Sequence, residues 1–165
     1  MQTASRTLCA VDVDYRDRHA VAACVVFDAW AAPTARREHT VVVDDIAPYE
    51  PGAFYKRELP CLLAVLKDVD AGVVVVDSYV WLDAGKPGLG ARLHAERGGV
   101  VVGVAKKHYA GAPGVEVLRG TSTQPLYVTA AGVDVEEAAG WVRAMHGPHR
   151  FPTLLKRVDA LCRAG

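Results

Sequence analysis

The sequence lacks a surplus of charge of either sign. Its 165 residues carry 19 Lys and Arg against 19 Asp and Glu, so the formal net charge is zero with histidine neutral. This balance excludes a protein that is basic over its whole surface, although it leaves room for a local basic patch that binds nucleic acid. With 51% hydrophobic and 23% charged residues, the composition is that of an ordinary globular protein. At this length we expect one domain spanning residues 1–165.

Long apolar runs and closely paired cysteines are also missing. No hydrophobic stretch approaches the roughly 20 residues that a membrane-spanning helix requires, so no such helix is expected. The N-terminus has no charged start followed by an apolar core, and it therefore does not resemble a secretory signal. The four cysteines lie far apart without CxxC spacing, which favours reduced, mostly buried thiols. Together these features predict a cytoplasmic protein.

Short apolar runs predict three β-strands in the first third of the chain. They occupy residues 7–15, 19–30 and 37–45, and their short connections favour an antiparallel meander. After the breaker pair Pro51-Gly52, leucines near helical spacing predict a helix that Glu58 opens.

The rest of the chain alternates between strands and helices. Residues 71–78 and 99–107 are β-branched runs typical of parallel strands buried on both faces. A short helix is expected between them, at residues 88–99. A hairpin at 114–130 follows, then a helix from Asp134 as N-cap to Gly147 as stop, and a last amphipathic helix at 152–165. This order predicts an α/β mixed sheet with an antiparallel start, a parallel βαβ continuation and helices on both faces.

Acidic residues fall at the expected ends of these elements. Asp12 lies near the end of the first strand, Asp77 ends the most apolar strand, and Glu58 opens the first long helix. If the first and fourth strands are neighbours, Asp12 and Asp77 emerge side by side, and their repulsion would favour a cation between them. Oxygen ligands of this kind favour Mg²⁺ or Mn²⁺. Lys106 would reach the same rim, beside a phosphate. Each acid alone is more often a strand stop or a helix cap, so the pattern leaves both interpretations open.

Several segments resemble the endonuclease V family, the deoxyinosine 3'-endonucleases. They are CAVDVDY (9–15), YEPGAFYKRELPCLL (49–63), VVVVDSY (73–79), VVGVAKKHYAG (101–111) and HRFPTLLKRVDAL (149–161). The similarity runs in the family's order from about residue 8 to the end. It implies an RNase H-like fold and Mg²⁺-dependent cleavage of a phosphodiester bond near hypoxanthine, a deaminated base, in DNA or RNA.

The resemblance also implies roles for individual residues. Asp12, Glu58 and Asp77 would form the acidic metal site, with Lys106 as the catalytic-site lysine. A wedge that opens the strand beside the lesion would consist of Pro48, Tyr49, Glu50 and Pro51. The pocket for the extruded base would be lined by Gly52, Phe54, Ser78 and Gly103. An aromatic wedge and a pocket suit this chemistry, because a base must leave the stack to be read.

Three departures mark the chain as a divergent member in this comparison, and one of them is DAGK (83–86) in place of the family's His-Pro-Arg-Arg run. The family's Gly-His-Gly after the central aspartate is Ser78-Tyr79-Val80 here, and the Cβ of Ser78 narrows the pocket. The family's histidine after the last strand, which would serve the metal site, is missing from AAGVDV (130–135), where Asp134 could replace it or cap a helix. The alternative to a nuclease is therefore a non-catalytic or altered-specificity nucleic-acid-binding descendant. We expect a monomer whose partner is DNA or RNA with deaminated bases.

Overall fold

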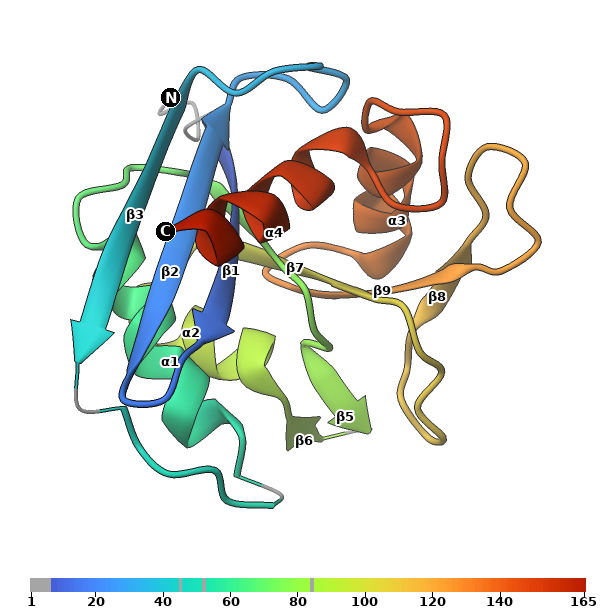
Figure 1. Cartoon of the computed structure of the whole chain (residues 1–165). Helices are drawn as coiled ribbons and strands as arrows, with labels where there is room; N and C mark the ends of the chain where they lie inside the picture. Colours follow the sequence, from blue (N-terminus) through green and yellow to red (C-terminus); the bar gives the residue numbers. More distant parts are fainter. Residues whose placement is uncertain (1–6, 45, 52, 84) are drawn as a thin grey trace, which may run out of the picture.

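A seven-stranded mixed sheet forms the centre of the computed structural model (Figure 1). The structure describes residues 7–44, 46–51, 53–83 and 85–165. The sheet strands are β1 (Leu8–Tyr15), β2 (His19–Phe27), β3 (Arg37–Asp44), β4 (Val73–Val76), β7 (Val100–Ala105), β8 (Val115–Val117) and β9 (Leu126–Ala131). The helices are α1 (Tyr55–Leu66), α2 (Leu89–Arg97), α3 (Val135–Ala144) and α4 (Thr153–Ala164). The strands lie in the order β3-β2-β1-β4-β7-β9-β8.

The pairing of the strands confirms the predicted mixed sheet. β1, β2 and β3 form an antiparallel meander, while β1, β4 and β7 run parallel to one another. β9 returns antiparallel beside β7 and pairs with β8, which confirms the predicted hairpin. β1 and β4 are neighbours in the sheet. The sequence analysis had expected Asp12 and Asp77 to lie side by side only if these two strands were adjacent.

Helices cover both faces of the sheet and give the chain two hydrophobic layers. α1 and α2 pack on one face against side chains such as Cys9 and Val11, whereas α3 and α4 pack on the other against Leu8 and Ala10 (Figure 1). Successive side chains of β1 therefore point alternately into the two hydrophobic layers, as expected for a strand, whose side chains repeat every two residues. All four valines of β4 are buried, which explains their continuous apolar run. The four cysteines are buried and free, which confirms the prediction.

Three local features differ from the sequence-based expectation. Helix α1 begins at Tyr55, so Glu58 lies within its first turn rather than at its start. Helix α3 ends at Ala144 instead of reaching Gly147, because Met145 adopts an extended backbone whose carbonyl accepts a hydrogen bond from Arg119. A small antiparallel pair, β5 (Trp81–Asp83) and β6 (Lys86–Pro87), was not anticipated, since so short a segment shows no alternation.

No helix in the described part of the chain is long and apolar enough to cross a membrane.

Candidate active site

Asp12 and Asp77 lie at the same edge of the sheet. Val11 of β1 pairs with Val76 of β4 in the parallel ladder, so the next residue of each strand is an aspartate. Asp12 is half-buried and its Oδ1 accepts a hydrogen bond of 2.9 Å from the Val13 N–H. Asp77 follows the last residue of β4 and is exposed. Two carboxylates therefore project from neighbouring strands, one sheltered and one open to solvent.

Helix α1 brings Glu58 to this edge. The Tyr15 hydroxyl at the end of β1 donates a 3.3 Å hydrogen bond to Glu58 Oε1, and the Arg57 guanidinium lies 3.9 Å from the centre of the Tyr15 ring. The pKa of Glu58 is raised to about 7, first by burial and then by the charges of Asp12 and Asp77, while the hydrogen bond from Tyr15 opposes the rise. Glu58 thus belongs electrostatically to the same acidic site.

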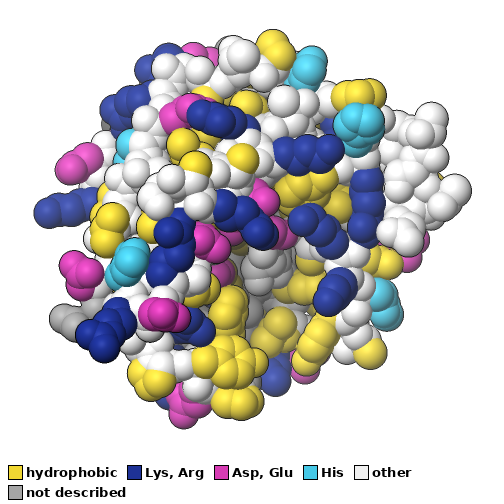
Figure 2. All heavy atoms as spheres, viewed as in Figure 1, with side chains coloured by type: hydrophobic (Ala, Val, Ile, Leu, Met, Phe, Trp, Pro, Cys, Tyr) yellow, Lys and Arg dark blue, Asp and Glu magenta, His cyan; other side chains and the backbone are white. Residues whose placement is uncertain are grey.

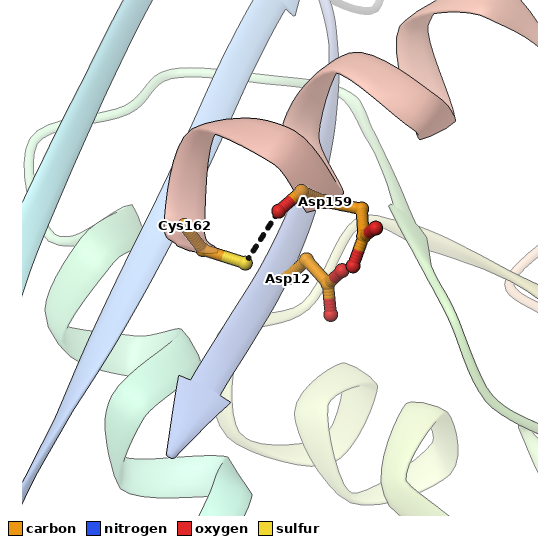
Figure 3. A group of neighbouring side chains, drawn as sticks. All are labelled: Asp12, Asp159 and Cys162. Atoms are coloured by element: carbon orange, nitrogen blue, oxygen red, sulfur yellow. Dashed lines mark hydrogen bonds between the residues drawn. The ribbon is translucent and has the colours of Figure 1, made fainter. Parts of the chain in front are cut away.

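Asp159 of helix α4 is a fourth acid that the sequence analysis missed. Figure 3 shows its carboxylate facing that of Asp12, with Cys162 beside them. The ligand atoms of these three residues all lie within 4.8 Å of one another, and the Cys162 Sγ donates to the Asp159 backbone carbonyl at 3.2 Å. Asp159 follows the buried Leu155 by four residues and precedes the buried Cys162 by three. Its position at the margin of the buried face of the helix could have indicated, from the sequence alone, that Asp159 points toward the sheet.

The surroundings of Asp12 disfavour its charge. The pKa of Asp12 is raised to about 7, and burial is the largest cause. The charge of Asp77 and a hydrogen bond with Asp159 contribute to this rise, whereas the hydrogen bond from the Val13 N–H opposes it. Partial loss of hydration at its carboxylate also raises the pKa of Asp77, although the residue as a whole is exposed, and the positive charge of Lys106 counteracts this rise. Among the described residues, no Lys or Arg nitrogen lies within 4.0 Å of the carboxylates of Asp12, Glu58 or Asp77. A set of clustered, uncompensated carboxylate oxygens fits a hard divalent cation such as Mg²⁺ or Mn²⁺.

Basic side chains surround this acidic edge. On the face drawn in Figure 2, acidic side chains lie in a hollow near the middle, with Lys and Arg side chains around it. Lys106 directly follows the last residue of β7, and its Nζ lies 4.2 Å from the centre of the Phe151 ring. The charge of Lys106 lowers the pKa of Asp77, so the two side chains interact across the edge. A phosphate could therefore meet both an acidic and a basic group here.

The segment before α1 presents its aromatic side chains to solvent. Tyr49 is 63% exposed and Phe54 is 41% exposed. Their rings are 6.4 Å apart, and Phe54 lies 6.2 Å from Tyr15, the residue bonded to Glu58. Pro48, Glu50 and Pro51 are also exposed, and Glu50 pairs with Lys56 at 3.2 Å. Gly52 lies outside the described residues. A continuous aromatic path thus joins the exposed tyrosine to the acidic site.

A cavity of about 370 Å³ adjoins these residues. Its lining includes Phe54, Ser78, Leu82, Pro87, Arg92 and Tyr109. Gly103 is not in this lining. It is buried beneath the 78–80 segment, where an added Cβ would lie 2.3 Å from the Ser78 carbonyl oxygen and 2.7 Å from Thr129 Oγ1. Glycine at 103 thus permits the close approach of the backbone that follows Asp77.

Comparison with known proteins identifies the family. The Endonuclease V family model matches residues 1–119. The endonuclease V of Streptomyces avermitilis is 33% identical over 178 residues, which cover 93% of this chain and 77% of that protein. The endonuclease V of Streptomyces coelicolor is also 33% identical, over 93% of this chain and 76% of its own length. The chain belongs to the endonuclease V family.

Solved structures of endonuclease V share the fold. The Streptomyces avermitilis enzyme superposes with a TM-score of 0.81 at 27% identity, covering 98% of this chain and 81% of that one. Human ENDOV gives 0.78 at 22% identity, over 96% and 83% of the two chains. The Ciona intestinalis protein, crystallised with a 24mer DNA containing an inosine followed by a ribo-adenosine, gives 0.79 at 17% identity, over 96% and 85%. The predicted RNase H-like fold of endonuclease V is confirmed.

Within this endonuclease V chain, Asp134 does not join the acidic site. It occupies the N-cap position of α3, and it is exposed. In the described part of the chain, the acidic and thiol groups gathered within 4.8 Å are Asp12, Asp159 and Cys162. The place next to Asp12 that a further ligand would fill is therefore occupied by a carboxylate from α4.

Proposed function

We propose that this chain is a divalent-metal-dependent endonuclease that cleaves a phosphodiester bond near inosine in DNA or RNA. The observation that carries this proposal is the convergence of four carboxylates and Lys106 on one sheet edge. Membership in the endonuclease V family and the Ciona intestinalis complex with inosine-containing DNA support the substrate class.

The carboxylates of Asp12 and Asp77 would hold Mg²⁺ or Mn²⁺, assisted by Asp159. When bound, the cation supplies the charge that lowers the pKa of a water and stabilises the leaving oxygen. Glu58, bonded to Tyr15, would hold and orient water molecules at the edge of the site.

The basic and aromatic residues would act on the nucleic acid. Lys106 would neutralise phosphate charge beside Asp77. Tyr49 would enter the gap left by an extruded base, since it is the more exposed of the two aromatics on the loop. The cavity lined by Phe54, Ser78 and Arg92 would receive that base. Gly103 would contribute indirectly, because its lack of a side chain lets the backbone of residues 78–80 lie close above it.

A cleavage assay tests the proposal. End-labelled single and double strands of DNA and RNA, each with one inosine, are incubated with excess protein and Mg²⁺ or Mn²⁺. We expect one cut near the inosine, none in a matched strand with guanosine, and none with Asp12→Asn. A folded wild-type protein that cuts no inosine strand under these conditions contradicts the proposal.

A non-catalytic or altered-specificity binding protein is the second candidate. It is favoured by Ser78, which lines the cavity at a position where the resemblance to the family implies a glycine. Binding of inosine-containing strands without cleavage, unchanged by Asp77→Asn, would support this candidate against the nuclease.

A further inference from the structure

The loop between α3 and α4, residues 145–152, is fastened to the protein by one buried arginine. Arg119 is only 5% exposed. Its Nη1 donates to the His149 carbonyl at 2.9 Å, and its Nη2 donates to the carbonyls of Met145 and, at 3.2 Å, Gly147. A buried guanidinium that donates to several carbonyls of one loop holds that backbone in a single arrangement. The loop is therefore a fixed support.

The same loop contacts the catalytic-site lysine in two ways. Arg150 Nη2 donates to the backbone carbonyl of Lys106, and also to that of Pro125 at 2.7 Å. The next residue, Phe151, presents its ring to the Lys106 Nζ at 4.2 Å from the ring centre. Phe151 itself packs against the core layer beneath α3 and α4. One residue thus holds the backbone of Lys106, and its neighbour holds the ammonium group.

Lys106 needs such support because its side chain is exposed at the end of β7. It is exposed, and a lysine ammonium on a four-carbon stem loses considerable conformational freedom when it is confined. Its charge nevertheless acts on Asp77. An aromatic face attracts an ammonium group at this distance and restricts it to a small region.

We propose that Phe151 is a positioning residue for Lys106, with its ring holding the ammonium beside Asp77 where the scissile phosphate binds. Arg150 fixes the start of the lysine side chain, and Phe151 fixes its end. This inference rests on the proposed function only for the role of Lys106 in cleavage. The geometric part stands on the contacts of the protein alone.

The first test observes the ammonium contact directly by NMR of the metal-free protein. Protons on the Cε of Lys106 that lie over an aromatic ring are shifted upfield by its ring current. We expect this upfield shift in wild type, its loss in Phe151→Leu and Phe151→Met, and its retention in Phe151→Tyr. An unshifted Lys106 signal in the wild type, or one unchanged in Phe151→Met, overturns the inference.

The second test measures single-turnover cleavage of an inosine-containing strand. Losing the cation–π contact should slow cleavage by about two- to fivefold in Phe151→Met at saturating protein, with the dissociation constant for the strand unchanged. Phe151→Tyr should restore the rate. The control is Trp30→Leu, which removes an aromatic ring from the same core layer beyond Phe27, at the end of the sheet away from Asp12.

The two tests separate this inference from the proposed function. If cleavage depends on Lys106 but proceeds equally well in Phe151→Met, the inference is wrong and the nuclease stands. If the wild type does not cleave, the proposed function fails, and the NMR measurement still decides whether Phe151 holds the lysine. Equal slowing in Trp30→Leu and Phe151→Met would show a general effect of packing and would overturn the positioning role.

Discussion

At the scale of single residues, the site consists of acids held where their charge is unfavourable. Asp12 and Glu58 have pKa values raised to about 7, with burial as the first cause of each. Such strain is typical of functional sites, because a protein gains no stability from crowded carboxylates in the absence of a cation. The acids therefore make stability depend on pH and on metal.

The metal-free protein should become less stable as the pH rises from 5 to 8. The raised pKa of Asp12 and of Glu58 means that the folded state binds protons more tightly than the unfolded chain. The stabilisation is fully present below the ordinary carboxyl pKa of about 4 and is lost as the pH passes about 7. Melting temperatures in EDTA, measured across this range, should fall for wild type and fall less steeply for Asp12→Asn. Equal slopes for the two proteins would contradict the assignment.

Tyr49 and Tyr55 should differ sharply when replaced by alanine. Tyr49 is 63% exposed, whereas Tyr55 is half-buried with the Arg92 guanidinium 3.5 Å from its ring centre. Tyr49→Ala should weaken binding of an inosine-containing strand by about 1–3 kcal/mol, as loss of a stacking aromatic does, at an unchanged melting temperature. Tyr55→Ala should lower the melting temperature instead. Fluorescence anisotropy and thermal melting distinguish them, and equal losses of affinity would mean that the wedge is misassigned.

At the scale of elements, the sequence was informative wherever a pattern is local. The valine run of 73–76 predicted a buried parallel strand, and the strand it formed lies between β1 and β7. The spacing within residues 152–165 predicted a helix, observed as α4 (Thr153–Ala164), but it did not predict the role of Asp159. Asp159 and Arg163, four residues apart on a helix, indicate an exposed ion pair, and this pair forms with Arg163 Nε 3.0 Å from Asp159 Oδ1. Only the packing of α4 across β1 and β2 brings the other side of this carboxylate to Asp12.

Arg16 binds the C-terminal end of α4, and we expect the stability of the protein to depend on this contact. Arg16 Nη2 donates to the carbonyls of Cys162, Arg163 and Gly165, and its Nε pairs with Asp14 at 2.6 Å. Arg16→Ala leaves the last carbonyls of the helix without this donor, so it should lower stability by about 1–2 kcal/mol. Arg18→Ala, an exposed arginine in the same turn, is the matched control. Urea unfolding measures both, and equal midpoints would show that Arg16 does not brace the helix.

At the scale of the whole molecule, the site is assembled from segments that are distant in sequence. Asp12, Glu58 and Asp77 were predicted because the sequence places each of them near the end or the start of an expected element, and such positions gather at the edge of a sheet. The resemblance of residues 49–63 and 101–111 to endonuclease V supplied the chemistry. The contact of α4 with β1 follows from tertiary packing, for which the sequence holds no local pattern. Sequence reasoning therefore considered Asp134, which lies close in sequence to the segment where a histidine ligand was expected, as a further ligand of the metal site.

Comparing Asp159→Asn with Asp134→Asn decides which acid completes the site. Asp159 faces Asp12, whereas Asp134 lies at the exposed start of α3. Loss of a ligand should weaken Mn²⁺ binding about tenfold, which removes about 1.4 kcal/mol of metal-induced stabilisation at saturating metal. Asp159→Asn should thus show a smaller rise in melting temperature on addition of Mn²⁺ than wild type, and Asp134→Asn should match wild type. If Asp134→Asn loses the metal-induced rise and Asp159→Asn keeps it, α4 contributes no metal ligand, and the site must rearrange when the cation binds.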